Sequence, residues 1–219
     1  GTLFRSIERI AKIKRPKLLL LENVKNIISH DGRRTFAVIK KSLEDAGYKF
    51  FYEIVNSETV VPQRRKRCFM VCVRKDLHKA FGDFTFPSFS GESIALSTII
   101  RPKVHERFTI SDALWSGHQA RSKRNLDRGT GFSATEADLS KPSNTIVARY
   151  GKDGKECLIP QKGKTPRMLS IEECKDLFGY PEHFAMPEAK TTSYKLFGNS
   201  VVVPVVSKIA NSMINKYLT

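Results

Sequence analysis

The sequence is poor in cysteine and lacks long apolar runs. Its four cysteines, Cys68, Cys72, Cys157 and Cys174, are scattered, and none forms a C-x-x-C pair. A disulfide framework is therefore not indicated, and we interpret all four as buried thiols rather than metal ligands or redox groups. No apolar run approaches the roughly 20 residues that span a bilayer, and the first residues lack a secretion-signal pattern. We expect a soluble, intracellular protein.

Acidic residues are few compared with basic ones. The chain has 22 Asp and Glu against 38 Lys and Arg, which gives a formal charge of +16. A polyanion is the natural partner of such a chain, although a basic surface kept for solubility is the alternative. Between positions 101 and 128 only three acidic residues accompany seven basic ones: Arg101, Lys103, Arg107, Arg121, Lys123, Arg124 and Arg128. This concentration favours a polyanion-binding segment.

Low-complexity tracts and internal repeats are also absent, and 40% of the 219 residues are hydrophobic. Such a chain is long enough to bury a hydrophobic interior. We therefore expect a folded protein, either one large domain or a core with a smaller lobe.

The first part of the chain has the pattern of an α/β layer. Apolar residues recur at helical spacing over residues 3–13, and Leu18 to Leu21 form an apolar run typical of a strand buried on both faces of a parallel sheet. A helix over 35–46 should end at Gly47, and strands are expected over 48–54 and 68–73. Because a complete doubly wound sheet needs more strands, these elements predict only part of a Rossmann-like sheet.

Beyond this part the pattern changes twice. From 77 to 165 turn residues are frequent, so we expect a second lobe that is mostly β or irregular. Then Ser170 and Glu173 have the spacing of a capping box, with Gly179 ending that helix, and a last helix is expected from Pro204 to Leu218. The expected organisation is an α/β part over 1–76, a second lobe over 77–165 and a return to the α/β part over 166–219.

Two short stretches carry candidate chemistry in the first part. Glu22-Asn23-Val24 follows the apolar run directly, and the carboxyl end of a parallel strand faces the crevice where ligands bind; a helix-capping pair is the alternative. Pro62-Gln63-Arg64-Arg65-Lys66-Arg67 leads into the strand over 68–73. Along an extended segment Gln63, Arg65 and Arg67 project to one face, so two guanidinium groups would point into one site; a solvated basic turn is the alternative.

Two further stretches complete an ordered set. Pro166-Arg167-Met168-Leu169-Ser170 precedes Gly179-Tyr180-Pro181, and Phe197-Gly198-Asn199-Ser200 precedes the last helix. For each stretch taken alone, the alternative is a purely structural role, such as a turn or the start of a helix. Together, however, the four stretches resemble the ordered motifs of the DNA cytosine-5 methyltransferases, over residues 1–75 and 166–219. One departure is Phe178-Gly179-Tyr180-Pro181, where the family usually has Gln-Gly-Phe-Pro.

The resemblance implies a mechanism for the site. In the family a cysteine thiolate adds to the sixth carbon of a flipped-out cytosine, and the fifth carbon takes a methyl group from S-adenosylmethionine. Glu22, beside Asn23, matches the glutamate that holds the ring nitrogen and the amino group, and Arg67 matches the arginine near the carbonyl oxygen. Gln63 and Arg65 would support the loop and nearby phosphates.

The same resemblance implies a partial cofactor site and an absent nucleophile. Asn199 and Ser200 match the motif that lines the methionine end of the cofactor, and Leu3 would add an apolar wall. The Gly-rich cofactor loop and the Pro-Cys nucleophile of the family have no match, because no cysteine here follows a proline. We expect this chain to be inactive without a second segment that supplies them, and we expect no metal.

The lobe over 77–165 occupies the place of the target-recognition domain. It is similar to the recognition regions of bacterial enzymes that methylate short GC-rich duplex sites, which implies restriction–modification. Arg, Lys and Gln side chains would read base edges or hold phosphates, and His118 is interpreted as a phosphate contact or a core residue. The residues expected at DNA are His118, Gln119, Arg121, Lys123, Arg124, Thr145, Arg149, Tyr150 and Lys152.

Three hypotheses remain open. The chain is the specificity subunit of a split methyltransferase completed by a partner chain, a fragment of one longer enzyme, or a catalytically inactive DNA-binding module derived from the family. Retention of both Glu22 and Arg67 favours an active composite, since a pure binding module has no use for that pair in a base pocket.

Overall fold

The computed structural model describes residues 2–131 and 134–219, without the side chain of Thr2. Contacts divide the chain into two compact units. The first, called the sheet unit, runs up to Asn56 and continues over Lys66–Phe89 and Val206–Thr219. The second, called the loop unit, comprises Ser57–Arg65 and Ser90–Val205. None of the helices formed by the described residues has the length and apolar character needed to cross a membrane.

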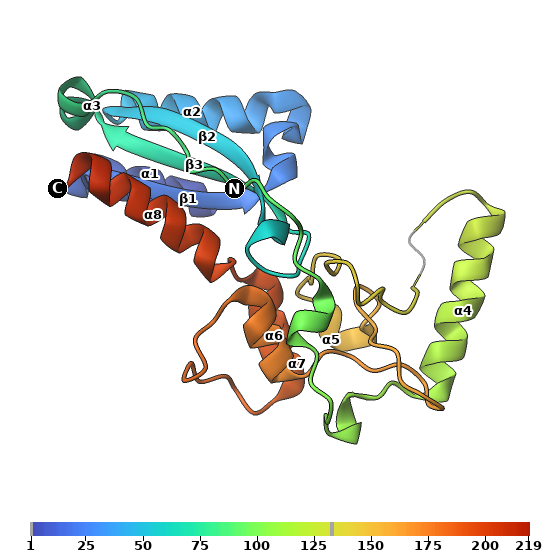
Figure 1. Cartoon of the computed structure of the whole chain (residues 1–219). Coiled ribbons are helices and arrows are strands. Elements are labelled where there is room, and N and C mark those ends of the chain that lie inside the picture. Colours follow the sequence, from blue (N-terminus) through green and yellow to red (C-terminus); the bar gives the residue numbers. More distant parts are fainter. Residues whose placement is uncertain (1, 132–133) are drawn as a thin grey trace. The chain divides into compact units, whose positions relative to one another are not determined.

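The sheet unit combines a three-stranded sheet with helices (Figure 1). Its elements in chain order are α1 (Thr2–Lys14), β1 (Leu18–Val24), the 3-10 helices η1 (Lys25–Ile28) and η2 (His30–Arg33), α2 (Arg34–Asp45), β2 (Tyr48–Asn56), β3 (Lys66–Arg74), α3 (Lys75–Phe81) and most of α8 (Val203–Tyr217). The helices and strands expected in this region are confirmed to within a few residues at their ends.

The strands form the order β1-β3-β2, and both pairings are antiparallel. The expectation of a parallel sheet was therefore wrong for the described strands. β1 and β2 are joined through α2 and run in the same direction, but β3 lies between them and pairs with both. β1 is half-buried rather than buried on both faces, and it extends to Val24, so Glu22 and Asn23 lie inside the strand instead of after it. An apolar run does not reveal the direction of its neighbour.

Each face of the sheet packs against different elements. On one face Met70 and Cys72 join Phe36 and Leu43 of α2 in a cluster that also takes in Ala11 of α1. On the other face the ring of Phe51 contacts that of Phe84, which in turn contacts Tyr217 of α8. Figure 1 shows α8 running alongside the sheet. Burial of these apolar side chains, at about 25 cal/mol per Å², is the main stabilising contribution.

The loop unit is irregular, and its longest element is helical. It contains η3 (Ser57–Thr59), η4 (Leu96–Ile99), η5 (Glu106–Phe108), α4 (Asp112–Asp127), α5 (Tyr150–Asp153), α6 (Ile171–Phe178) and α7 (Lys190–Asn199). In place of strands, its described residues form isolated bridges such as Glu136↔Leu158 and Ile159↔Arg167. The expectation of a mostly β lobe was thus wrong in its β part.

Sequence periodicity missed α4 for a physical reason. Only His118 of its 16 residues is buried, so no apolar stripe marks the helix, and Figure 1 shows it lying apart from α6 and α7. The usable signal was its cap: the hydroxyl of Ser111 accepts a hydrogen bond from the backbone N–H of Leu114, which satisfies one exposed donor of the first turn.

The expected capping box of α6 is confirmed. The Ser170 hydroxyl accepts from the Glu173 backbone N–H at 3.1 Å, and the Glu173 carboxylate accepts from the Ser170 N–H at 2.7 Å. Gly179 ends the helix with a φ of 68°, a conformation that favours glycine. Glu173 also binds Arg167 through two bonds of 2.7 and 2.8 Å and accepts from the backbone N–H of Arg101. One fully buried carboxylate thus joins the start of α6 and the residues before it to the segment of Arg101.

We expect Glu173→Ala to lower the free energy of unfolding by about 3–5 kcal/mol, because it leaves the buried guanidinium of Arg167 without its charge partner. The matched control is Asp176→Ala on the same helix, where the carboxylate is 40% exposed and pairs with Arg101, itself 47% exposed; there we expect less than about 1 kcal/mol. Urea denaturation of both variants measures the difference. Equal losses in the two variants would contradict the assigned role of Glu173.

Candidate functional site

An ion pair between β1 and β3 is the centre of the candidate site. The Nε atom of Arg67 lies 3.0 Å from Oε1 of Glu22, and the two side chains are 15% and 26% exposed. In the register Glu22 faces Phe69 and Val24 faces Arg67. Because alternate residues of a strand share a face, the two charged side chains meet diagonally on one face of the sheet.

Burial shapes the ionisation of this pair and of its neighbour. Desolvation lowers the pKa of the Arg67 guanidinium, and the Glu22 carboxylate opposes that shift. Burial, with a smaller contribution from Glu22, raises the pKa of the Cys68 thiol to about 11. At neutral pH this thiol therefore stays protonated, and it lacks the thiolate character of a nucleophile.

Asn23 does not join the pair. It lies one residue after Glu22 and faces Cys68 in the register, so its side chain projects to the opposite face. Its side-chain oxygen accepts a hydrogen bond from the backbone N–H of Val24 at 2.9 Å. We assign Asn23 to shaping the end of β1.

Arg65 occupies a different environment from Arg67. β3 begins only at Lys66, so the stretch before it is not one continuous strand as the sequence analysis expects. Arg65 is 3% exposed, and its guanidinium donates to the backbone carbonyls of Ile146 at 2.9 Å, Gly198 at 3.0 Å and Ser200 at 2.6 Å. The side chain of Arg65 therefore stabilises the loop unit by joining these segments.

Gln63 and Gly198 belong to the same arrangement. Gln63 is fully buried; its amide oxygen accepts from the N–H of Ile146 at 3.0 Å, and its amide nitrogen donates to the carbonyl of Leu177 at 3.4 Å. A Cβ on Gly198 would lie 2.1 Å from the backbone nitrogen of Ala148, so only glycine fits. We call the set Gln63, Arg65, Ile146, Gly198 and Ser200 the Arg65 cluster.

The three residues expected at the cofactor form little of a site by themselves. Leu3 is 78% exposed on α1, and Asn199 is exposed at the end of α7. The Ser200 hydroxyl is engaged with the hydroxyl of Tyr180. These open positions do not by themselves enclose S-adenosylmethionine. The described residues also contain no group of three or more His, Cys, Asp or Glu arranged to hold a metal ion.

The residues expected at DNA divide into exposed and buried ones. Exposed positions are Gln119, Arg121, Lys123 and Arg124 on α4, together with Arg149 and Lys152. His118 is buried, and its Nε2 lies 2.8 Å from the carbonyl oxygen of Asp153. Of the two expected roles, phosphate contact or core residue, its position fits a core residue. Tyr150 is fully buried, with its hydroxyl donating to the carbonyl of Cys157, and it is no longer a DNA candidate.

Thr145 is only partly accessible. Its hydroxyl donates to the carbonyl of Arg64 at 2.5 Å, which fixes this loop against the basic stretch. Arg149 forms an ion pair of 3.3 Å with Asp153. The basic residues expected at DNA on α4 are thus exposed. Over residues 145–152, fewer side chains are available to contact DNA than the sequence predicts.

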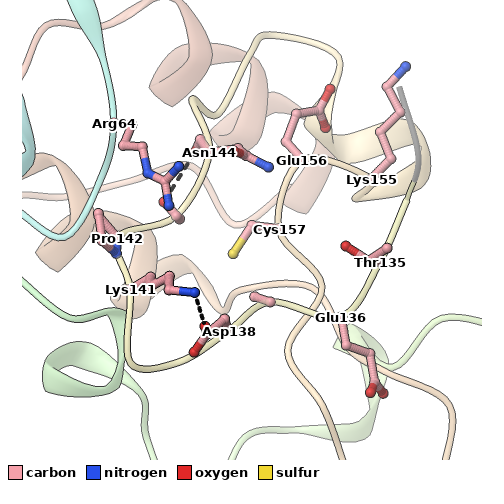
Figure 2. A pocket seen from close by; sticks show the side chains of 12 residues that line it. Arg64, Thr135, Glu136, Asp138, Lys141, Pro142, Asn144, Lys155, Glu156 and Cys157 are labelled. Carbon is pink, nitrogen blue, oxygen red and sulfur yellow. Dashed lines mark hydrogen bonds and ion pairs between the residues drawn. The ribbon is translucent and has the colours of Figure 1, made fainter. Parts of the chain in front are cut away.

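A pocket in the loop unit escaped the sequence analysis (Figure 2). It has a volume of about 170 Å³ and is lined among others by Arg64, Asn144, Glu156 and Cys157. Its residues come from separate segments and carry no common motif, so no sequence signal could have assembled it. Arg64 and Asn144 lie beside residues that the sequence analysis did single out.

The fold resembles that of solved methyltransferases. A mutant DNMT2 from Spodoptera frugiperda matches with a TM-score of 0.75 and 20% identity, over 96% of this chain and 71% of that chain. The methyltransferase EhMeth of Entamoeba histolytica matches with a TM-score of 0.71 and 19% identity, over 98% and 69%. At such identities the likeness concerns the fold, and that fold is the methyltransferase fold in part.

The sequence comparisons establish the family. The family model described as C-5 cytosine-specific DNA methylase matches residues 1–215, and the chain belongs to this family. It is 43% identical over 217 residues to the Type II methyltransferase M.SsoII of Shigella sonnei, covering 98% of this chain and 57% of that protein. The Type II methyltransferase M1.ScrFI of Lactococcus lactis subsp. cremoris is 42% identical, with 98% and 56% covered. The chain thus spans little more than half the length of these relatives.

We expect Arg65→Lys to lower the free energy of unfolding of the loop unit by about 2–4 kcal/mol, because one ammonium group cannot reproduce a planar fork that reaches three carbonyls. Arg64→Lys is the matched control, since Arg64 is exposed, and it should change stability by less than about 0.5 kcal/mol. Chemical denaturation measures both variants. An Arg65→Lys variant as stable as the control would show that the cluster is dispensable.

Proposed function

We propose that this chain is the part of a DNA cytosine-5 methyltransferase that recognises a short GC-rich duplex site and holds the extruded target cytosine. The observation that carries the proposal is the 3.0 Å pair of Glu22 and Arg67, on one face of β1 and β3, in a chain that belongs to this family. The Cys nucleophile and most of the S-adenosylmethionine site come from a segment outside this chain.

The pair has the chemistry that a cytosine ring requires. Addition of a thiolate to the ring develops negative charge on it, and preorganised donors stabilise such charge in a dry site. The Glu22 carboxyl group accepts from the amino group of cytosine through one oxygen and, when protonated, donates to the ring nitrogen through the other. The guanidinium of Arg67 stays protonated and offers donors to the carbonyl oxygen of the base. S-adenosylmethionine, when bound, supplies the methyl group.

The ion pair also fixes the geometry before a base arrives. Arg67 donates to the carbonyl of Lys66 at 3.0 Å as well as binding Glu22, so the guanidinium plane is anchored at two points. A carboxylate held in one orientation reads the Watson–Crick edge and rejects other bases, which offsets the few kcal/mol that extrusion costs. Glu22 thus acts in selection and in catalysis.

Recognition of the duplex is assigned to the lobe over 77–165, which we propose as the target-recognition domain between the catalytic segments 1–76 and 166–219. On α4 the exposed Arg121 and Arg124 share one side of the helix, and we assign them to phosphate contacts; Gln119 and Lys123 share another side, and we assign them to a base edge and a phosphate. Arg149, directly before α5, and Lys152, within α5, are assigned to the same surface. The relatives are named Type II methyltransferases, so we propose a role in bacterial restriction–modification, in the cytoplasm at the nucleoid.

The completing segment has a candidate contact surface on α1. Leu3, Ile10 and Ile13 are 78%, 55% and 65% exposed, and their spacing places them on one side of the helix. Exposed apolar stripes of this kind mark interaction sites. We propose that the nucleophile-bearing segment, supplied by a partner chain or by the same polypeptide, covers this stripe.

We expect methyl transfer from labelled S-adenosylmethionine to GC-rich duplex DNA only when this chain is mixed with a chain that carries the cofactor loop and the Pro-Cys motif, for example the corresponding part of M.SsoII. Glu22→Gln should lower the rate at least about 100-fold, because proton and hydrogen-bond assistance at the ring is lost. Glu44→Gln on α2, an exposed carboxylate, is the control and should keep the full rate. Activity of this chain alone, or a mixture that binds DNA but never methylates it, would overturn the proposal.

We expect the double variant Arg121→Ala, Arg124→Ala to bind duplex DNA more weakly and with a smaller dependence on salt. Each lost phosphate contact lowers the slope of log K against log salt by about 1. Lys40→Ala with Lys41→Ala on α2 removes the same charge elsewhere and should leave the slope unchanged. Fluorescence anisotropy at several salt concentrations measures both, and identical slopes for the two double variants would exclude α4 from the DNA surface.

A further inference from the structure

The main chain at the end of α7 is fixed by hydrogen bonds on both sides of Asn199. The backbone N–H of Ser200 donates to the carbonyl of Phe197 at 2.9 Å. The carbonyl of Ser200 accepts from the guanidinium of Arg65 at 2.6 Å, and the same guanidinium donates to the carbonyl of Gly198 at 3.0 Å. Little freedom therefore remains in the backbone that carries Asn199.

The hydroxyl group of Ser200 takes part in two further hydrogen bonds. It donates to the carbonyl of Val201 at 3.1 Å, and its oxygen lies 2.5 Å from the hydroxyl oxygen of Tyr180. A serine hydroxyl has one proton to donate. Because that proton serves Val201, the Tyr180 hydroxyl is the donor in the second bond. Tyr180 thus completes the hydrogen bonding of Ser200 from a separate segment of the loop unit.

Tyr180 is itself held by contacts that do not involve its hydroxyl. Its backbone N–H donates to the carbonyl of Lys175 at 3.0 Å, at the end of α6. The centroid of its ring lies 4.6 Å from that of Phe184 and 6.0 Å from that of Phe197. These contacts would remain if the hydroxyl were removed. The hydroxyl therefore serves the bond to Ser200 rather than the packing of the ring.

Asn199 differs from its neighbours because its side chain is free. It is exposed, and its amide has no hydrogen-bond partner among the described residues. An amide both donates and accepts, so it fits the carboxylate and ammonium groups at the methionine end of S-adenosylmethionine. A free amide on a fixed backbone is a preorganised contact, which loses little conformational freedom when a ligand binds.

We propose that Tyr180 is a positioning residue of the cofactor site: its hydroxyl holds Ser200, and Ser200 holds the main chain that orients the amide of Asn199. This role rests on the proposed function, which assigns S-adenosylmethionine to the chain. Tyr180 acts through Asn199 and needs no contact with the cofactor or the cytosine. Its hydroxyl should therefore affect how tightly the cofactor binds, and leave the transfer of the methyl group from the bound cofactor unchanged.

The first experiment measures hydrogen exchange of the full chain by NMR, without cofactor. In Tyr180→Phe the amide hydrogen of Ser200 should exchange at least about fivefold faster, because the segment has lost one of its hydrogen bonds. Tyr52→Phe is the matched control, since Tyr52 is 48% exposed on β2 in the sheet unit, and it should leave this rate unchanged. Equal exchange in wild type and Tyr180→Phe would contradict the role of the hydroxyl.

The second experiment measures binding of labelled S-adenosylmethionine by equilibrium dialysis, with this chain mixed with the same completing chain as in the methyl-transfer experiment. Tyr180→Phe should raise the Kd and the KM for the cofactor about three- to tenfold, with kcat and the KM for DNA unchanged. Tyr194→Phe is the control for a general loss of stability. It removes a buried hydroxyl of α7 that donates to the carbonyl of Leu169, and it should keep the wild-type Kd.

A double variant tests whether Tyr180 acts through Asn199. Asn199→Ala should weaken cofactor binding at least as much as Tyr180→Phe, because it removes the contact itself. Combining the two substitutions should weaken binding no further, since coupled residues are not additive. An unchanged Kd in Tyr180→Phe, an equal loss in Tyr194→Phe, or additive effects in the double variant would overturn the proposal.

The wild-type mixture separates the two ways in which the role of Tyr180 can fail. A mixture without saturable cofactor binding would overturn the proposed function and, with it, the role of Tyr180. A mixture that binds the cofactor and methylates DNA, with a Tyr180→Phe variant that binds equally well, would overturn the role of Tyr180 alone.

Discussion

The buried guanidinium of Arg65 is the interaction on which the loop unit depends. The described part of this unit has isolated bridges in place of strands, so its segments lack the ladder that normally satisfies backbone carbonyls. One charged fork bonds the carbonyls of Ile146, Gly198 and Ser200 together, and charge-assisted bonds are roughly twice as strong as neutral ones. Together with Gln63 and Glu173, this side chain supplies order that a sheet would otherwise give, and Gly198 lets the backbones approach closely enough for it to do so.

Three arginines within four positions have different roles because their partners differ. Arg64 is exposed at the rim of a pocket, Arg65 is buried among carbonyls, and Arg67 pairs with Glu22. Nothing in the run of basic residues distinguishes them, since each has the same charge and the same donors. The tertiary environment decides which arginine stabilises the fold and which remains available to a ligand.

The parts of the fold that depend on local sequence could be predicted, and those that depend on distant partners could not. The capping box of Ser170 and Glu173 and most element positions follow from spacing, and the meeting of Glu22 with Arg67 followed from the family motifs. The antiparallel position of β3 was missed because an apolar run is compatible with either direction. α4 was missed because it has almost no buried face, and the partners of Arg65 are backbone carbonyls, which carry no residue signature.

Buried and exposed residues alternate along the same stretches of the loop unit. Gln63 and Arg65 are buried while Arg64 between them is exposed, and Ser143 is buried while Asn144 is exposed. Successive side chains of extended backbone point to opposite sides, so fixing every second residue in the interior orients the residues between them outward. The buried residues keep the loops in place, so the exposed ones are held in defined directions without contributing to the packing. This alternation explains how an irregular lobe without a sheet can still present its side chains at defined positions.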